Sequence, residues 1–215
     1  MKPTSYRLIV FLALMTVALA IFSGILWTKG PKPQIVTSAP ATVEKTVTSG
    51  TAAIGGPFTL VATNGQTVSD RTYRGKWLLI YFGYTYCPDA CPIALSNMSV
   101  ALQNLGSDAS KFQPLFITVD PQRDTRQVMT EYLKSFDSRI IGLTGTQAQI
   151  DRVIKEYHLY VSRQKPDADG DYLVDHSAYI YLMDPRGKFV NVTEGSATGN
   201  AIAEWLRMKM AQADR

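Results

Sequence analysis

The segment Trp77-Leu78-Leu79-Ile80-Tyr81-Phe82 is an unbroken apolar run, and it decides the fold class of this chain. A run of this kind is typical of a strand that is buried on both faces of a sheet. Apolar residues at helical spacing follow from Pro88, and Gly106 ends that pattern. A buried strand that leads directly into a helix indicates an α/β fold.

After Gly55 the chain alternates between strand-like and helix-like patterns. Asn64-Gly65 predicts a hairpin turn between two short strands at residues 58–61 and 66–68. Further strands are predicted at residues 112–119, 140–143, 178–183 and 188–192, with a short pair at 159–161 and 172–174. Helices are predicted after a cap at Asp124 or Thr125, after a cap at Thr146, and over residues 201–210. We therefore expect residues 55–215 to form a thioredoxin-like α/β domain, with a mixed central sheet flanked by helices.

The N-terminal part of the chain has a different character. Residues 8–27 carry no charge and, at about 1.5 Å per residue, span roughly the 30 Å of a bilayer core. We predict a cytoplasmic N-terminus at residues 1–7, a single-pass transmembrane anchor at 8–27, and a flexible linker rich in Pro, Thr and Ser at 28–54.

The charges beside this anchor predict its orientation. Lys2 and Arg7 precede the span and Lys29 and Lys32 follow it, so the positive bias toward the N-terminal side is slight. We expect the domain to lie outside the cytoplasm. A cleaved signal peptide is the alternative, because Ala18-Leu19-Ala20 has the form of a cleavage site. The apolar run continues past this site, which favours the anchor.

The composition bounds the class of partner. Hydrophobic residues make up 46% of the chain and charged residues 19%, which is ordinary for a globular protein. The formal net charge is +4, and the Lys and Arg residues are scattered rather than gathered in a stripe. We therefore expect no binding of nucleic acid.

Cys87 and Cys91 are the only two cysteines of the chain, and they lie at the turn from the first central strand, residues 77–82, into the helix that follows. If residues 87–91 are helical, the two Cα atoms lie about 6 Å apart on one face. A helix N-terminus favours thiolates, so we expect a lowered pKa for both sulfurs. Two soft sulfurs on one face suit Cu(I). A redox pair and a structural disulfide remain alternatives, although a bridge that closes so short a loop stabilises little.

His176 is the third candidate ligand. It stands just before the predicted strand 178–183, and in a thioredoxin-like sheet the loop before that strand approaches the first helix. Two thiolates and one imidazole, with no fourth protein ligand in evidence, fit copper or a loosely held zinc. His158, the other histidine, lies at the end of a predicted amphipathic helix, and we expect it to be a surface or helix-terminal residue.

Several acidic residues lie near these candidates. Asp120 and Asp124 follow a predicted strand, and we expect them to cap the next helix, with Arg123 paired to either carboxylate. Asp89 and Asp175 are neighbours of the candidate ligands, and we expect them to support the ligands or to be solvated.

Three motifs carry a resemblance to a known family: Gly-Tyr-Thr-Tyr-Cys-Pro-Asp-Ala-Cys-Pro at residues 83–92, Thr-Val-Asp-Pro-Gln-Arg-Asp-Thr at 118–125, and Asp175-His176-Ser177. Together they resemble the Sco (SenC) family from about Gly55 to the C-terminus. The resemblance implies a thioredoxin-like fold and copper, as Cu(I) or Cu(II), bound by Cys87, Cys91 and His176. It also implies a role in assembling the copper A site of cytochrome c oxidase subunit II.

The resemblance has further consequences for partners and location. It implies contact with other copper carriers or thiol reductants, and a bacterial or mitochondrial inner membrane with the domain in the periplasm or its equivalent. The family often has another residue at the position of Tyr86, a departure that touches no proposed ligand.

A thiol–disulfide oxidoreductase that keeps acceptor cysteines reduced is the alternative function. Three residues separate Cys87 from Cys91, however, where the usual redox motif has two. His176 also stands where thioredoxins place a cis-proline. We therefore predict a metallochaperone rather than an enzyme.

Overall fold

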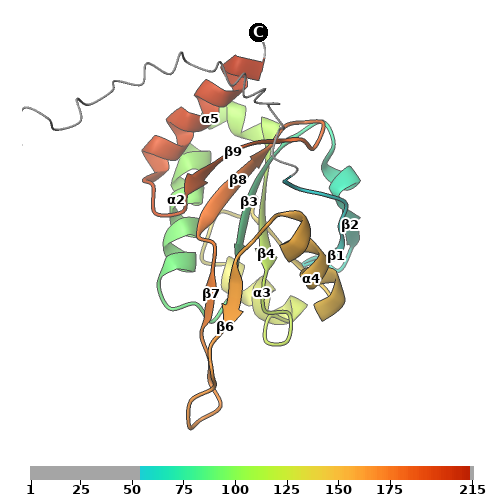
Figure 1. Cartoon of the computed structure of the whole chain (residues 1–215). Coiled ribbons are helices and arrows are strands. Elements are labelled where there is room, and N and C mark those ends of the chain that lie inside the picture. The colour runs from blue at the N-terminus through green and yellow to red at the C-terminus, as the bar shows by residue number, and fades with distance from the viewer. Residues whose placement is uncertain (1–53, 214–215) are drawn as a thin grey trace, which may run out of the picture. The chain divides into compact units, whose positions relative to one another are not determined.

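The computed structural model describes residues 54–213, so the predicted N-terminus, anchor and nearly all of the linker lie outside the described residues. A seven-stranded sheet has the order β2-β1-β5-β4-β3-β8-β9, and β6 and β7 form a separate pair (Figure 1). The strands are β1 Thr59–Ala62, β2 Thr67–Ser69, β3 Trp77–Gly83, β4 Phe112–Thr118, β5 Ile141–Thr144, β6 Val161–Arg163, β7 Val174–His176, β8 Tyr179–Met183 and β9 Phe189–Glu194. The helices are η1 Asp70–Tyr73, α2 Ala90–Asn104, η2 Gly106–Lys111, α3 Arg126–Leu133, α4 Gln147–Glu156 and α5 Gly199–Ala213. Within residues 54–213, none of the helices combines the length and apolarity that a membrane crossing requires.

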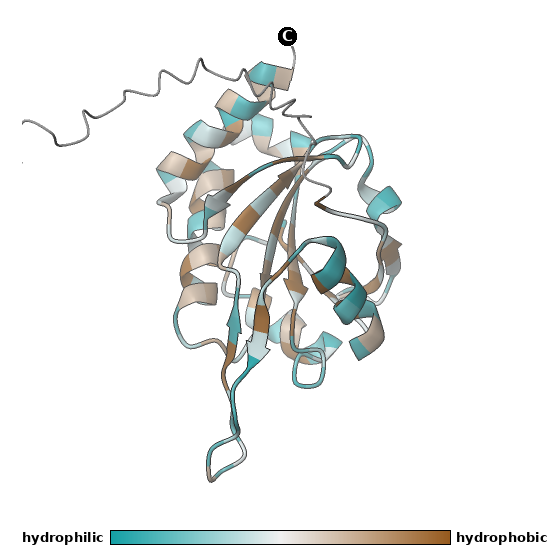
Figure 2. Ribbon diagram, in the orientation of Figure 1, coloured by the Kyte–Doolittle hydropathy of each residue, from teal (hydrophilic) through white to brown (hydrophobic). Residues whose placement is uncertain are grey.

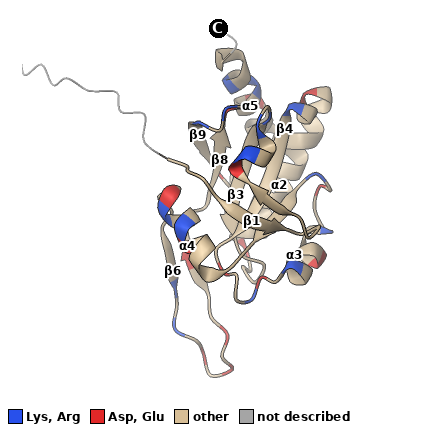
Figure 3. Ribbon diagram, turned by 90° about the vertical axis from the view of Figure 1, so that its right-hand side faces the viewer, with Lys and Arg blue, Asp and Glu red and all other residues tan. Residues whose placement is uncertain are grey.

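Strand β3 lies at the centre of the fold. All seven of its residues are buried, and it pairs in parallel with β4 and antiparallel with β8. Helices α2, α3 and α5 lie on one side of the sheet and α4 lies on the other (Figure 3). Apolar residues dominate the central strands and form one buried core, whereas the tip of the hairpin beyond β6 and β7 is hydrophilic (Figure 2). The predicted mixed sheet flanked by helices is therefore confirmed.

Local signals in the sequence identified several boundaries correctly. The Asn64-Gly65 turn joins β1 to β2, with Gly65 at a φ of 88°. Thr125 is the N-cap of α3 and its side chain accepts a hydrogen bond from the Val128 N–H. Thr146 caps α4 in the same way through the Gln149 N–H.

The segment around the two cysteines differs from expectation. Asp89 is the N-cap of α2 and has a non-helical backbone, so the helix begins at Ala90. Cys87 and Pro88 therefore precede the helix, so residues 87–91 do not meet the helical condition under which the two Cα atoms would lie on one face. A residue before proline is biased away from the helical region, which agrees with a helix that begins only after Pro88.

The short strand pair is also displaced from its predicted position. Val161 pairs with His176 and Arg163 with Val174, two residues further along each strand than expected. His176 is therefore the last residue of a strand rather than part of a loop. The Ser177 N–H bonds to the Tyr160 carbonyl and so extends the pairing past the strand end.

Candidate metal centre

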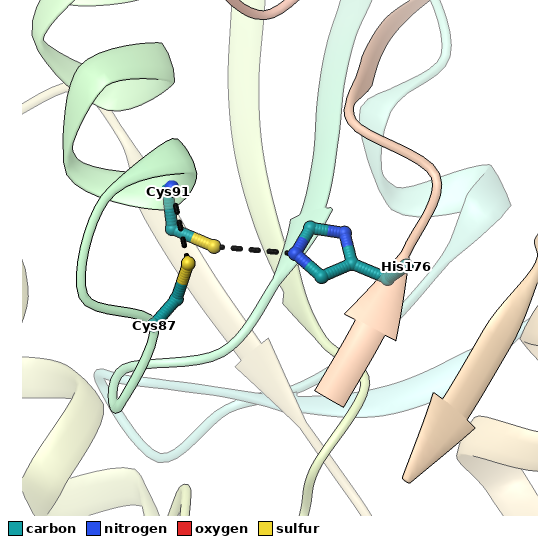
Figure 4. Close-up of side chains that lie close together, drawn as sticks. All are labelled: Cys87, Cys91 and His176. Atoms are coloured by element: carbon teal, nitrogen blue, oxygen red, sulfur yellow. Dashed lines mark hydrogen bonds between the residues drawn. The ribbon is translucent and has the colours of Figure 1, made fainter. Parts of the chain in front are cut away.

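Cys87, Cys91 and His176 come together at one end of the sheet (Figure 4). One potential ligand atom from each residue lies within 4.8 Å of the other two. Cys87 lies on the loop between β3 and α2, Cys91 in the first turn of α2, and His176 at the end of β7. The loop and the helix approach from one side and the strand from the other. Within residues 54–213 no other group of three His, Cys, Asp or Glu side chains meets these distances.

A glycine makes room for the cysteine of the helix. A Cβ atom on Gly83 would lie 2.7 Å from the Sγ atom of Cys91 and 2.9 Å from the ring of Phe116. Both distances are shorter than van der Waals contact, so any side chain here would displace the sulfur or the ring. The last residue of β3 thus determines how closely Cys91 packs against the sheet.

A buried carboxylate anchors the loop that carries Cys87. Asp124 accepts hydrogen bonds from the Thr85 N–H, from the Thr85 hydroxyl at 2.6 Å and from the Thr118 hydroxyl at 2.6 Å. Burial raises the pKa of Asp124 above its usual value. The expectation that Asp124 caps the following helix is wrong, because Thr125 takes that position and Asp124 turns back toward the cysteine loop.

The two thiols are electrostatically unequal. A side-chain hydrogen bond from Cys91 lowers the pKa of Cys87 to about 4, and His176 and the N–H groups of Asp89 and Cys91 act in the same direction. The Cys91 N–H donates to the Cys87 sulfur at 3.4 Å. The interaction with Cys87, together with burial, raises the pKa of Cys91. The expected lowering of both pKa values is therefore wrong for Cys91, which is fully buried in the core.

The imidazole of His176 presents one nitrogen to the sulfurs. Its Nδ1 atom lies 3.1 Å from the Ser177 carbonyl oxygen, which can only accept a hydrogen bond, so Nδ1 carries the proton. In the neutral ring this leaves a lone pair on Nε2, and Nε2 lies 3.4 Å from the Cys91 sulfur. The rings of Tyr81 and Tyr84 meet the imidazole edge to face. The ring is thus oriented for ligation by a backbone carbonyl and two aromatic neighbours.

Asp120 has a different role from the one expected. It is fully buried and does not cap a helix; its carboxylate bonds to Arg123, Arg163 and the Tyr172 hydroxyl. The expected pairing of Arg123 with a carboxylate is confirmed, with Asp120 as the partner. The role of Tyr172 was not predicted, and the available signal was an aromatic residue directly after the largely polar residues 164–171.

The remaining residues named from the sequence lie around the centre without joining it. Asp89 is at the N-cap position of α2 without a side-chain capping bond, and the Asp175 carboxylate accepts hydrogen bonds from the Gln164 amide. His158 follows α4 with a φ of 51° and lies outside the cluster, as expected for a helix-terminal residue.

Comparison with known proteins agrees with this geometry. The SCO1/SenC family model matches residues 46–211. The chain is 43% identical over 164 residues to protein SenC of Rhodobacter capsulatus, covering 76% of this chain and 74% of that protein. It is 42% identical over 140 residues to the mitochondrial SCO1 homolog of Homo sapiens, covering 64% of this chain and 46% of that protein. The chain thus spans about half the length of that curated relative.

A solved structure shares the fold. The structure of Bradyrhizobium japonicum ScoI with copper bound is similar to this chain, with a TM-score of 0.68 and 46% sequence identity over 73% of this chain and 99% of that one. The copper-bound Arabidopsis thaliana ScoI structure has a TM-score of 0.69 at 38% identity, over 74% of this chain and 99% of that one. With the family model matching most of its length, this chain belongs to the SCO1/SenC family.

Proposed function

We propose that this protein binds copper through Cys87, Cys91 and His176 and supplies it to the copper A site of cytochrome c oxidase subunit II. One observation carries the proposal: two cysteine sulfurs and an imidazole nitrogen lie within 4.8 Å of one another. Thiolate and imidazole ligands suit copper in both of its biological oxidation states. The copper-bound ScoI structure, 46% identical to this chain, supports the choice of metal.

The ligand set also fits a protein that releases its metal. Three ligands leave a coordination position open, and an incoming thiolate or imidazole of an acceptor can enter there. Cys87 is only partly buried and ionises readily, so it faces the acceptor as the more exchangeable sulfur. Cys91 lies in the core, so its sulfur is the less exchangeable of the two ligands.

The location belongs to the same proposal. We place residues 8–27 in an inner membrane, bacterial or mitochondrial, with the copper domain in the periplasm or its equivalent. The apolar, uncharged run and the Pro-rich stretch behind it support this placement. Protease added to sealed right-side-out membrane vesicles should digest the domain, and a domain that stays protected would refute this orientation.

A thiol–disulfide oxidoreductase is the second candidate, and the unequal thiols favour it. A low-pKa, partly exposed Cys87 beside a buried, protonated Cys91 is the arrangement of an attacking and a resolving cysteine. This chemistry uses the same two sulfurs, and it would keep acceptor cysteines reduced for copper entry. It does not require His176, and this difference separates the two functions.

The metal content of the purified full chain, in detergent and loaded with Cu(I) or Cu(II), tests the proposal. We expect one copper per chain and a large loss of Cu(II) affinity in His176→Ala. In Cys87→Ser we expect the binding of both Cu(I) and Cu(II) to be lost. His158→Asn is the matched control, since it changes the other histidine at a positive φ that asparagine tolerates. Unchanged copper affinity in His176→Ala, together with efficient turnover of a disulfide substrate, would favour the oxidoreductase.

A further inference from the structure

The hairpin that carries His176 has little support from its own pairing. Strands β6 and β7 have three residues each and pair only with one another. An isolated two-stranded hairpin is marginally stable in water. Figure 1 shows the hairpin extending away from the sheet. A cavity of about 460 Å³ is lined by Tyr86 of the cysteine loop on one side and by hairpin residues between Gln164 and Leu173 on the other. Contacts other than strand pairing must therefore hold the hairpin in place.

Asp120 supplies the first of these contacts. Its buried carboxylate accepts a hydrogen bond from Arg163 of β6 at 3.0 Å. The Tyr172 hydroxyl, on the other side of the hairpin, lies 2.9 Å and 3.1 Å from the two carboxylate oxygens. A buried carboxylate is strongly disfavoured unless cations and donors surround it. Asp120 thus binds both sides of the hairpin to the end of β4.

Arg123 connects this contact to the cysteine loop. Its Nε atom bonds to Asp120 at 2.6 Å, and its guanidinium lies 3.6 Å from the centre of the Tyr172 ring. The same guanidinium lies 4.7 Å from the centre of the Tyr86 ring, one residue before Cys87. Its Nη2 atom is buried and has no hydrogen-bond partner within residues 54–213. Stacking and the Asp120 ion pair therefore hold this group between the two segments.

We propose that Asp120, Arg123 and Tyr172 form a clip that holds β7 against the cysteine loop, and that this clip positions His176 as a ligand. Tyr172 precedes His176 by four residues, about 13 Å of extended chain at roughly 3.3 Å per residue. Movement of the Tyr172 ring away from Arg123 therefore shifts His176 away from the Cys91 sulfur. The inference deepens the proposed function and rests on it, because the position of His176 matters for function only if His176 binds copper.

A second contact limits what loss of the clip can do. The Val174 N–H donates to the Tyr84 hydroxyl at 3.1 Å, and this bond lies between the clip and His176. It remains when Arg123 is replaced. We therefore expect a hairpin that samples displaced positions in clip variants, rather than one that is released completely.

The first arm of the test requires no metal. The chain has two histidines, so the imidazole NMR signals of the reduced, metal-free full chain in detergent report on His176 beside an internal reference, His158. In Arg123→Met and Tyr172→Leu we expect the His176 signals to broaden and to lose the shift imposed by the flanking tyrosine rings. The His158 signals should stay in place. Tyr172→Phe keeps the stacked ring and should restore most of the His176 shift.

The matched control for charge is Arg139→Met. Arg139 also pairs with an aspartate through Nε and Nη2, but its partner Asp137 precedes β5, away from the hairpin. The Arg139→Met substitution should leave the His176 signals unchanged. Urea unfolding of each variant identifies any variant that does not fold. If Arg123→Met does not fold, the comparison of Tyr172→Phe with Tyr172→Leu tests the clip.

The second arm measures copper. If His176 is in place for one-tenth of the time, apparent Cu(II) affinity falls about tenfold, because affinity scales with the population of the competent state. We expect this loss in Arg123→Met, with weaker nitrogen coupling in the Cu(II) EPR spectrum and Cu(I) affinity changed less than about threefold. Unmoved His176 signals in both Arg123→Met and Tyr172→Leu would overturn the clip. A wild-type chain that binds no copper refutes the proposed function instead, and leaves the metal-free arm decisive for the clip.

Discussion

The Nε2 atom of His176 lies 3.4 Å from the Sγ atom of Cys91, although 85 residues separate the two in the chain. Cys91 reaches this position because Gly83 leaves room for its sulfur. His176 reaches it because β7 pairs with β6 and is tied to Tyr84. The centre is therefore a product of two separately supported segments, and each can be perturbed by itself.

The unequal thiols predict selective alkylation. Because the pKa of Cys87 is lowered to about 4, its reaction with iodoacetamide in the reduced, metal-free chain should reach half of its maximal rate near that pH. Cys91 is buried and its pKa is raised, so it should remain unmodified at neutral pH. Mass spectrometry of peptides after timed alkylation measures both. Equal labelling of the two cysteines would contradict the assignment.

The same asymmetry makes stability depend on pH. An unfolded thiol has a pKa of about 8.5, so between about pH 4 and 8.5 the unfolded chain binds more protons at Cys87 than the folded chain does. The Cys87 contribution to the free energy of unfolding is thus complete above about pH 8.5 and disappears as the pH falls through about 4. Urea unfolding at pH 5 and pH 8 should show this increase in the wild type. In Cys87→Ser it should be smaller, and an equal increase there would exclude Cys87 as its source.

Gly83→Ala should disturb the centre through packing. The added methyl group would lie 2.7 Å from the Cys91 sulfur, and overpacking of this kind costs about 1–3 kcal/mol. We expect a lower free energy of urea unfolding and weaker copper binding. Gly56→Ala is the control, because its close neighbours are atoms of the flexible Glu156 side chain. A Gly83→Ala chain with wild-type stability and affinity would show that the sulfur has free space.

Asp124→Asn should loosen the cysteine loop. The carboxylate accepts hydrogen bonds from two hydroxyls and the Thr85 N–H, and an amide cannot accept all of them. Leaving buried donors unpaired costs about 1–3 kcal/mol, to be measured by urea unfolding. The exposed Asp151→Asn should cost little by comparison. Retention of full stability at pH 7 in Asp124→Asn would mean that this carboxylate does not anchor the loop.

Copper loading should stabilise the folded chain. A ligand that binds only the folded state adds about 2.7 kcal/mol when present at 100 times its dissociation constant. We expect a rise in the melting temperature with Cu(I) or Cu(II), reversed by a chelator. In His176→Ala the rise with Cu(II) should be much smaller than the rise with Cu(I), because both sulfurs remain. A melting temperature of the wild type that copper does not change would contradict the proposed ligand set.

Local signals in the sequence were sufficient for most of the fold. The apolar run at residues 77–82 predicted the buried strand β3, and Asn64-Gly65 predicted the first hairpin. Thr146 predicted one helix start, and Asp124 or Thr125 predicted another, where Thr125 is the cap. These features depend on residues a few positions apart, since side-chain periodicity, turn conformation and capping bonds are all short-range.

The sequence by itself also identified Cys87, Cys91 and His176 as candidate ligands, from residue chemistry and from the expected order of elements. Only the tertiary structure decided that Cys87 precedes the helix, that Cys91 has a raised pKa, and that Asp124 supports the cysteine loop. Burial and distant hydrogen bonds set these properties. They depend on which segments meet in space, and no local pattern records that.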